Sequence, residues 1–240
     1  MRCNPLGLAL ATASALALLC SSCGSSGIGA SGRIGKQSLN LENFDGVEAT
    51  NAFVVDLRQD KDFRVEIEAD EAFLPYLDAT IRGNHLVLSM RQSLDLAGGE
   101  VRATITMPVL KTAKASGASR VMLDDFSSED PLEIEASGAS RVEGDLNTGD
   151  VHIAASGASN VKLSGRGNNL RAIASGASHI DLGDFKGRDT SAIASGASTI
   201  RVFAKGRLDA IASGASHITY LGNPILGDIN DSGASSIKPD

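Results

Sequence analysis

Ser116-Gly117-Ala118-Ser119 is the first of seven copies of the tetrapeptide Ser-Gly-Ala-Ser in the second half of this 240-residue chain. Successive copies are 21, 19, 19, 20, 18 and 19 residues apart. Self-similarity with a period near twenty residues is typical of a solenoid, in which each unit buries its apolar face against its neighbours. We interpret the copies as a structural repeat, and they begin at Ser116, Ser137, Ser156, Ser175, Ser195, Ser213 and Ser232.

The residues that follow each tetrapeptide alternate as the residues of a β-strand do. The seventh residue after the first serine is apolar in most copies, and the fifth is always β-branched: Val121, Val142, Val161, Ile180, Ile200, Ile218 and Ile237. Two apolar columns separated by one residue indicate a strand with one face inward. With 26 Gly and no Trp, the chain suits a narrow tube. The sequence therefore predicts an all-β fold, a parallel β-helix with about 19–20 residues per coil.

The column between these two apolar columns predicts how the coils align. In successive copies it contains Glu143, Lys162, Asp181 and Arg201. If the coils stack as parallel strands about 4.8 Å apart, these residues form a ladder of alternating charge. Because an exposed ion pair contributes only roughly a few tenths of a kcal/mol, the ladder would fix the alignment more than it would stabilise the fold.

The residues before the tetrapeptide leave two alternatives open. Simple alternation points Ile173, Ile193 and Ile211 outward as an apolar stripe. A one-residue slip at the tetrapeptide would instead turn them inward, and we expect the slip because glycine tolerates a bulge. We also expect the coils to close at turns such as Gly144-Asp145 and Gly183-Asp184, where the interval between copies varies.

Residues 38–110 lack the tetrapeptide but alternate as strands do, for example over Phe53-Val55-Leu57. Gly83 marks a hairpin turn, and Asp70 is a candidate N-cap for a short helix that is ended or kinked at Pro75. We interpret this region as an irregular N-terminal β portion, the first coils and cap of a solenoid whose repeats occupy residues 111–240.

The N-terminus has the pattern of an export signal. Arg2 precedes an apolar run from Leu6 to Leu19, which is too short to span a membrane. A small residue and Cys23 follow, and the segment resembles a bacterial lipoprotein signal, whose cysteine becomes the lipidated N-terminus. We therefore predict a signal peptide over residues 1–22, lipidation at Cys23 and a Gly/Ser tether over residues 23–37. The alternative is an ordinary secretory signal with incidental cysteines.

The opening phrase Phe44-Asp45-Gly46-Val47, the later phrase Ile105-Thr106-Met107-Pro108-Val109-Leu110 and the serial tetrapeptides resemble the bacterial head GIN domain family. That family is described as "putative auto-transporter adhesin" and as a domain of unknown function. The resemblance covers residues 38–238. It implies a right-handed parallel β-helix in an exported, often lipid-anchored protein of Gram-negative bacteria, and it supplies no catalytic residues to carry over.

No cluster in the sequence predicts a catalytic site, a metal site or a cofactor. His179 and His217 fall in the same column but two coils apart, which is too far for one shared ion. The repeated serines have no recurring histidine beside them to act as a base. Turn formation explains the loop aspartates, with calcium binding as the alternative: Asp145, Asp150, Asp184, Asp189, Asp228 and Asp231.

These observations favour a non-enzymatic module of the cell envelope, held at the outer membrane by a lipid anchor, that presents rows of side chains to a protein or glycan partner. The net charge of −7 argues against a nucleic-acid partner. Two alternatives stay open. Other β-helices process or bind polysaccharides, and the strand edges at the end of a β-helix could join molecules end to end.

Overall fold

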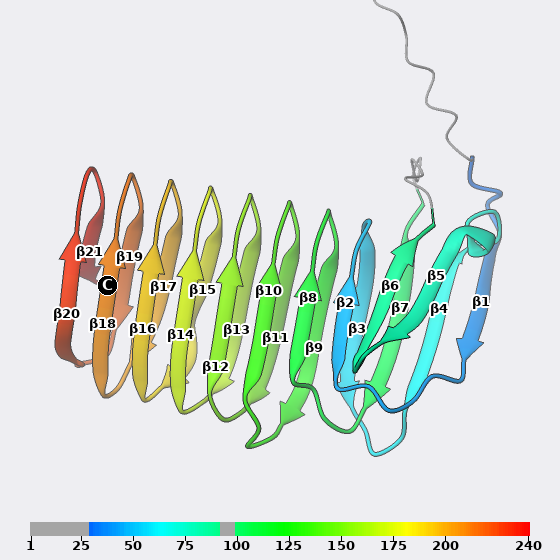
Figure 1. The fold of residues 1–240 in the computed structure, drawn as a ribbon, viewed down its shortest axis with the longest axis horizontal. Coiled ribbons are helices and arrows are strands. Elements are labelled where there is room, and N and C mark those ends of the chain that lie inside the picture. The colour runs from blue at the N-terminus through cyan, green and yellow to red at the C-terminus, as the bar shows by residue number, and fades with distance from the viewer. Residues whose placement is uncertain (1–28, 92–98) are drawn as a thin grey trace, which may run out of the picture.

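The computed structural model describes residues 29–91 and 99–240, which form a long stack of coils built almost entirely of strands (Figure 1). Two sheets make up the stack. Sheet A has eleven strands among the described residues, in the order β1-β4-β7-β3-β9-β11-β13-β15-β17-β19-β21, and sheet B has ten, in the order β20-β18-β16-β14-β12-β10-β8-β2-β6-β5. The predicted all-β solenoid is confirmed, whereas the predictions for residues 1–22 and Cys23 lie outside the described residues.

Each repeat coil contributes one strand to each sheet, and the tetrapeptide joins the two strands. The strands before the tetrapeptides lie in sheet B: β8 (Thr112–Ala115), β10 (Leu132–Ala136), β12 (Val151–Ala155), β14 (Asn169–Ala174), β16 (Asp189–Ala194), β18 (Arg207–Ala212) and β20 (Ile225–Asp231). The strands after them lie in sheet A: β9 (Arg120–Ser127), β11 (Arg141–Asn147), β13 (Asn160–Arg166), β15 (His179–Gly187), β17 (Thr199–Ala204), β19 (His217–Leu221) and β21 (Ser236–Pro239). In Figure 1 the chain runs upward in sheet B and downward behind it in sheet A as the stack advances from green to red, which makes the coil right-handed.

Equivalent residues of successive coils pair in register. Val142 pairs with Val161, Val161 with Ile180, and Ile180 with Ile200 across sheet A. All four side chains are fully buried. Each coil therefore buries its apolar face against the coils on either side, as a solenoid requires, and the alignment predicted from the repeat is confirmed.

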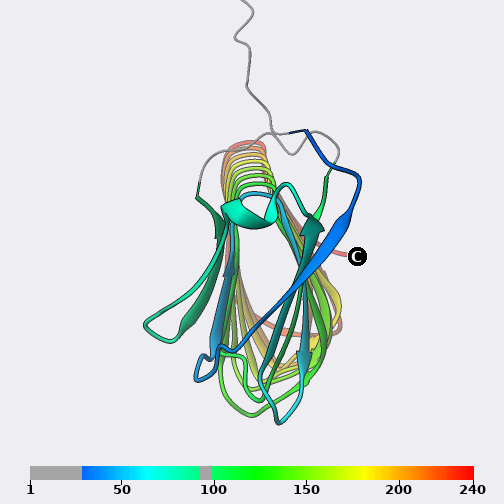
Figure 2. The same ribbon diagram turned by 90° about the vertical axis from the view of Figure 1, so that its right-hand side faces the viewer.

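The cross-section of the stack is a wedge. Figure 2, which looks along the stack, shows the two sheets converging where the tetrapeptide turns lie over one another and diverging toward the opposite edge of each coil. At the narrow end the inward position next to the turn is filled by alanine in sheet B, as at Ala155 and Ala174. Larger side chains such as Leu146 and Phe185 are buried farther along the strands of sheet A. Side-chain size thus follows the width of the tube.

The expected slip at the tetrapeptide is wrong. Ile173, Ile193 and Ile211 pair with one another across β14, β16 and β18, but the alanines on either side of each isoleucine are the buried residues. Ile211 is 45% exposed. The narrow end of the wedge accounts for this arrangement, because it admits alanine side chains but not isoleucine. The three isoleucines therefore form an outward row on sheet B.

The turns expected at Gly144-Asp145 and Gly183-Asp184 lie instead inside strands β11 and β15. Where β15 faces β17, the register shifts between Leu182 and Lys186, which marks a β-bulge. A bulge adds residues to one strand without moving the residues on either side out of alignment. Part of the variation in the interval between tetrapeptides is therefore absorbed within sheet A.

The N-terminal region forms two further parallel coils that stack out of chain order. One coil, β2 (Gly46–Ala49) and β3 (Phe53–Gln59), lies directly against the first repeat coil. The other, β6 (His85–Met90) and β7 (Val101–Met107), lies beyond it. The chain after β7 therefore passes the β2–β3 coil to reach β8, and on the way the backbone N–H of Lys111 donates to the Asp45 carbonyl at 2.7 Å.

Antiparallel strands close this end of the stack. β1 (Ile34–Leu39) and β4 (Arg64–Asp70) extend sheet A, and β5 (Leu77–Arg82) extends sheet B. The hairpin predicted at Gly83 is confirmed, since β5 and β6 pair antiparallel across it and its φ is 62°. The helix predicted after Asp70 is only the 3-10 turn η1 (Leu74–Tyr76), and its N-cap is Phe73.

Asp70 instead fastens the start of the described chain to this cap. Its carboxylate accepts hydrogen bonds from the backbone N–H groups of Ser31 at 2.9 Å, Gly32 at 2.7 Å and Ala72 at 2.9 Å. Desolvation opposes ionisation of the carboxyl, but these hydrogen bonds outweigh it and lower the pKa of Asp70 to about 2. β1 also begins at Ile34, inside the segment predicted as a tether up to residue 37. The chain is thus held to the fold from Ser31 onward.

Candidate functional site

The serine corner, which we define as the seven stacked tetrapeptide turns, is a continuous ladder of backbone hydrogen bonds. The first serine of each turn donates its N–H to an alanine carbonyl of the preceding coil, as Ser156 does to Ala136 at 2.9 Å. The third residue donates to a glycine carbonyl of that coil, as Ala158 does to Gly138 at 2.7 Å. The predicted repeat serines therefore act here through their backbone.

The fourth residue of the tetrapeptide is the buried serine. The Ser178 hydroxyl lies 3.1 Å from the Ala155 carbonyl oxygen of the preceding coil and 2.8 Å from the Ser175 carbonyl oxygen of its own turn. The sequence holds a signal for this burial, because the fourth serine stands two residues before the β-branched column and so shares its inward face. Only the first of these serines, Ser119, lacks a hydroxyl partner among the described residues, since the coil before it turns without the tetrapeptide.

Glycine is required at the second position for two reasons. Gly157 has a φ of 73°, in the left-handed region that side chains disfavour. A Cβ atom on Gly157 would also lie 2.6 Å from the carbonyl oxygen of Gly138 in the coil before it. The serine corner is therefore fixed at each of its four positions, and its hydroxyls serve the fold.

The charged column on sheet A is in register, as predicted. Glu143 pairs with Lys162, Lys162 with Asp181, and Asp181 with Arg201 along the stack. Only the last step brings the charged atoms into an ion pair, at 3.6 Å, and Arg201 also pairs with Asp240 at 2.7 Å. The hydrogen bond with Asp240 is the main cause that raises the pKa of Arg201. The four positions are thus aligned in register, but among the described residues only Asp181 and Arg201 form an ion pair with each other.

The histidines also lie where the repeat predicts. His179 pairs with Thr199 and Thr199 with His217, so the two histidines are two coils apart. His217 Nδ1 lies 2.9 Å from the Ser236 hydroxyl. Among the described residues, no group of three or more His, Cys, Asp or Glu side chains is arranged to hold a metal ion.

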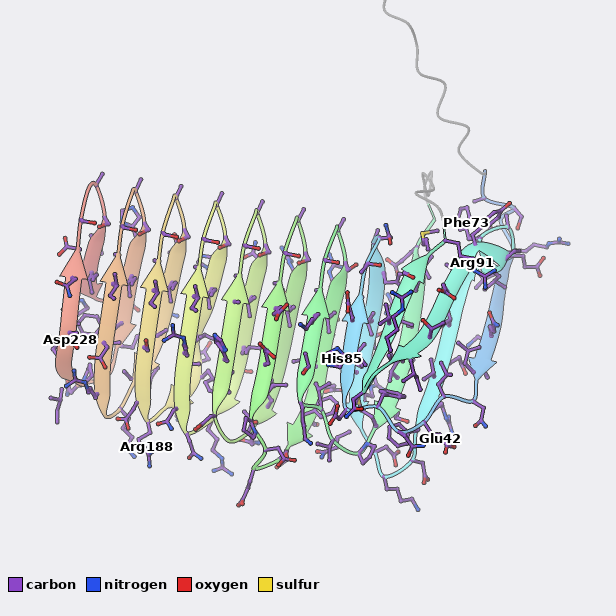
Figure 3. The ribbon with its side chains drawn as sticks, viewed as in Figure 1. Glu42, Phe73, His85, Arg91, Arg188 and Asp228 are labelled. Carbon is purple, nitrogen blue, oxygen red and sulfur yellow. The ribbon has the colours of Figure 1, made fainter. Side chains whose placement is uncertain are left out.

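Three of the loop aspartates connect one coil to the next, and Asp145 does so by accepting a hydrogen bond from the Ser164 hydroxyl at 2.8 Å. Asp150 accepts a hydrogen bond from the backbone N–H of Asn169 at 3.1 Å, and Asp189 accepts one from Arg207 at 2.9 Å. Both donors begin the sheet B strand of the following coil. We name this side of the stack, opposite the serine corner, the loop edge, and Figure 3 shows Arg188 projecting from it. These carboxylates have a structural role at the loop edge.

A surface hollow with a volume of about 640 Å³, which we name the sheet B trough, runs across the start of β10, β12, β14, β16 and β18. One side is the loop edge, where Asp150, Asn169 and Asp189 lie. The other side is an outward row of sheet B, one residue from each of five consecutive coils: Glu133, His152, Arg171, Ser191 and Asp209. The sequence gives no warning of the trough, because outward positions need not repeat.

The charged side chains at the β18 end of the trough form ion pairs, whereas in the described ranges Arg171 in its middle and Glu133 at its β10 end do not. Arg207 pairs with Asp209 and with Asp228, and the hydrogen bond from Arg207 lowers the pKa of Asp209. In the part of the chain that the structure describes, neither Arg171 nor Glu133 makes an ion pair within 4.0 Å. The trough therefore presents a cation in its middle and an anion at its β10 end, and neither side chain makes a hydrogen bond or an ion pair among the described residues.

Beside the trough on the same face lies the isoleucine row defined above. Ile173 stands two residues after Arg171 on β14, so the two side chains project from the same side of sheet B. Ile193 and Ile211 continue the row over the next two coils. Sheet B thus offers, side by side, an apolar stripe and a trough bordered by charged side chains, and this face is the candidate binding surface.

Comparisons with known proteins agree with this architecture. A "putative adhesin" from Bacteroides fragilis has 21% sequence identity and a TM-score of 0.82, with coverage of 89% of this chain and 100% of that one. A "putative lipid binding protein" from Parabacteroides distasonis has 20% identity and a TM-score of 0.72, with coverage of 89% and 99%. A "putative adhesin" from Parabacteroides merdae has 16% identity and a TM-score of 0.74, with coverage of 89% and 98%. At these identities the likeness shows a shared fold.

No helix within residues 29–91 and 99–240 has the length and apolar character needed to cross a membrane. No curated protein matches the chain. Residues 43–224 match the family described as "Putative auto-transporter adhesin, head GIN domain". This match covers most of the solenoid and its N-terminal coils, as the resemblance in the sequence led us to expect. The chain belongs to the head GIN domain family.

Proposed function

We propose that this protein is a non-enzymatic, adhesin-like module of the cell envelope that binds its partner on the outward face of sheet B. The observation that carries the proposal is the pairing of the isoleucine row with the trough. Ile211 is 45% exposed although the buried alanines beside it fill the core, and Arg171 has no ion pair among the described residues. Exposed apolar side chains beside unused charges are typical of an interaction surface.

The descriptions of related proteins also support an adhesin-like role. Two of the solved structures with this fold are described as adhesins, and the family carries the same description. A third is described as lipid binding. A stack of coils presents rows of side chains at a fixed spacing, which suits recognition of an extended partner.

Binding of solubilised cell-envelope components to the immobilised protein would test the surface. We expect Arg171→Glu and Ile193→Asp, both on sheet B, to reduce capture at least fivefold. Lys162→Glu, on the outward face of sheet A, is the matched control and should leave capture unchanged. Equal capture by all three variants would show that the partner binds elsewhere.

We also propose that Cys23 carries the lipid that holds the module at the outer membrane, as its place after an apolar leader suggests. Asp70 is compatible with this geometry, because it fixes the chain at Ser31 and Gly32, a short distance after Cys23, to the capped end of the stack. Metabolic labelling with palmitate should mark the wild-type protein and not the Cys23→Ala variant. Labelling of both would remove Cys23 as the attachment point.

End-to-end assembly is the alternative that one observation favours. The last coil has no buried residue, and Leu226 is 51% exposed. Against assembly, Asp231 occupies the position that alanine fills in the buried column, and Pro239 stands in the edge strand β21. An inward-pointing charge and an edge proline both disfavour further strand pairing. Sedimentation over a range of concentrations should therefore show a monomer, and filaments would reverse this assignment.

A further inference from the structure

We infer that the sheet B trough binds a neutral, extended polysaccharide, with about one sugar ring over each coil. This inference rests on the proposed function, since it names the partner of the same surface. Three features support it: the spacing of the outward row, the balance of charge in the trough, and the backbone groups beneath the trough, which are already hydrogen-bonded to neighbouring strands.

The trough is a linear site with a regular period. Its outward row takes one residue from each of five consecutive coils that pair in register, from Glu133 to Asp209. Neighbouring strands lie about 4.8 Å apart, so the four steps of the row extend over roughly 19 Å. A pyranose ring in an extended polysaccharide advances its chain by nearly the same length as one coil. Successive rings therefore meet equivalent positions of the stack.

The charges in the trough fit a neutral ligand rich in hydroxyl groups. The lining contains three basic side chains, from Lys111, Arg171 and Arg207, and four acidic ones. A polyanion would meet those carboxylates, and the net charge of the whole chain is −7. Sugar hydroxyls both donate and accept, so one hydroxyl can donate to Glu133 and another, two coils along the trough, can accept from Arg171. Among the described residues, these are the two charged side chains of the lining that make neither a hydrogen bond nor an ion pair.

A peptide partner suits this site less well. Every strand beneath the trough, from β10 to β18, pairs with a strand on each side, so its backbone N–H and C=O groups are already bonded. Addition of a peptide strand needs a free sheet edge, which the trough lacks. An extended peptide also places side chains on one face at about 6.6–6.8 Å intervals, which do not match the coil spacing.

The isoleucine row supplies the apolar contact that sugars need. The faces of a pyranose ring expose C–H groups, which bind apolar side chains, most often aromatic ones. The trough lining contains no aromatic side chain other than His152. Ile173 and Ile193, next to the trough, offer a flat aliphatic surface in that role. The expected affinity is therefore modest for one ring and rises with chain length.

Affinity electrophoresis and titration calorimetry of the purified protein would test the inference, using soluble neutral glucans, mannans and galactans with α or β linkages, and polygalacturonate as the acidic comparison. We expect binding of at least one neutral polymer, with affinity rising at least tenfold from a two-ring to a five-ring oligomer. Arg171→Ala and Glu133→Gln should each weaken it about tenfold, while Lys162→Ala on sheet A should not.

Two results would overturn the inference. One is the absence of binding to every neutral polymer while the protein still captures envelope components through sheet B, which would keep the proposed function and remove the glycan. The other is preferential binding of polygalacturonate, which would contradict the charge argument. Loss of envelope capture from sheet B itself would instead remove the proposed function, so the two failures are distinguishable.

Discussion

The serine corner and the loop edge close the same coils in opposite ways. At the serine corner four residues repeat seven times, and each is tied to the coil before it by a backbone or hydroxyl hydrogen bond or by close glycine contact. At the loop edge the connections differ in sequence, and side chains such as Asp150 and Asp189 make the links. One corner sets the register, and the other tolerates variation. The binding surface proposed here lies beside the variable edge.

Substitution at the serine corner should have the largest effect. Gly176→Ala would place a Cβ atom 2.7 Å from the Gly157 carbonyl oxygen at a φ of 71°, and the backbone there cannot give way without moving two coils. We expect a loss of about 3 kcal/mol in the free energy of unfolding, measured by urea denaturation.

Gly183→Ala is the matched control for this change. Its added Cβ atom would meet only the flexible end of the Arg201 side chain, and its φ is not in the left-handed region. We expect a loss below about 1 kcal/mol. Similar losses for both glycines would mean that the corner is no more constrained than the strands.

The buried hydroxyl of the corner should have a smaller effect. Ser178→Ala removes the hydroxyl that reaches two carbonyl oxygens, but one of these, on Ala155, still accepts the backbone N–H of Ser175. We therefore expect a loss of about 1 kcal/mol in the free energy of unfolding.

Ser175→Ala, at the first position of the same turn, is the comparison. The backbone N–H of Ser175 makes its link to the preceding coil, so we expect a change within about 0.5 kcal/mol. A larger loss for Ser175→Ala than for Ser178→Ala would show that the side chain of the first serine, and not that of the fourth, stabilises the corner.

The outward position of the isoleucine row can be tested with little cost in stability. A cysteine at Ile193 should react with a maleimide within minutes in the folded protein, whereas one at the buried Ala192 should be protected. Unfolding free energies should change by less than about 1 kcal/mol for Ile193→Cys. If the cysteines at both positions were protected, Ile193 would point inward, as the one-residue slip predicts.

The smallest effect concerns the hydrogen bonds that the Asp70 carboxylate accepts from Ser31, Gly32 and Ala72. The pKa of Asp70 lies at about 2 in the folded protein and at 3.8 without the fold, so the carboxylate stabilises the fold fully above pH 3.8. That contribution is lost as the pH falls from about 3.8 toward 2. We expect the urea midpoint of the wild type to fall more steeply over this window than that of Asp70→Asn. If the urea midpoints of the two proteins fell in parallel with pH, the hydrogen bonds to Asp70 would not form in solution.

The same contrast explains what the sequence could predict. The buried column from Val121 to Ile218 and the register of Glu143 with Lys162 followed from repetition, because stacking forces equivalent positions into equivalent environments. Simple alternation gave the outward place of Ile193 as one of two alternatives, but the choice between them depends on the width of the wedge, which no single strand encodes. The sequence did not mark Arg171 and Glu133 as part of a binding site, because packing does not constrain outward positions and so gives them no repeating pattern.

The order of the N-terminal coils was also beyond reach of the pattern. Alternation identified β3 as a strand, but no local pattern states that it lies between β7 and β9. That choice depends on contacts between distant residues, such as the pairing of Gly46 with Thr112. Sequence periodicity therefore predicts the coils and not their neighbours.

This interleaving has a consequence for how the protein matures. A chain synthesised from its N-terminus can form the β6–β7 face of the β2–β3 coil early, yet the opposite face stays uncovered until residues 112–127 are present. The repeats therefore cannot simply elongate a finished N-terminal template. They must first complete it, so the rate of folding is set by one long-range closure, after which the remaining coils add as short, local steps.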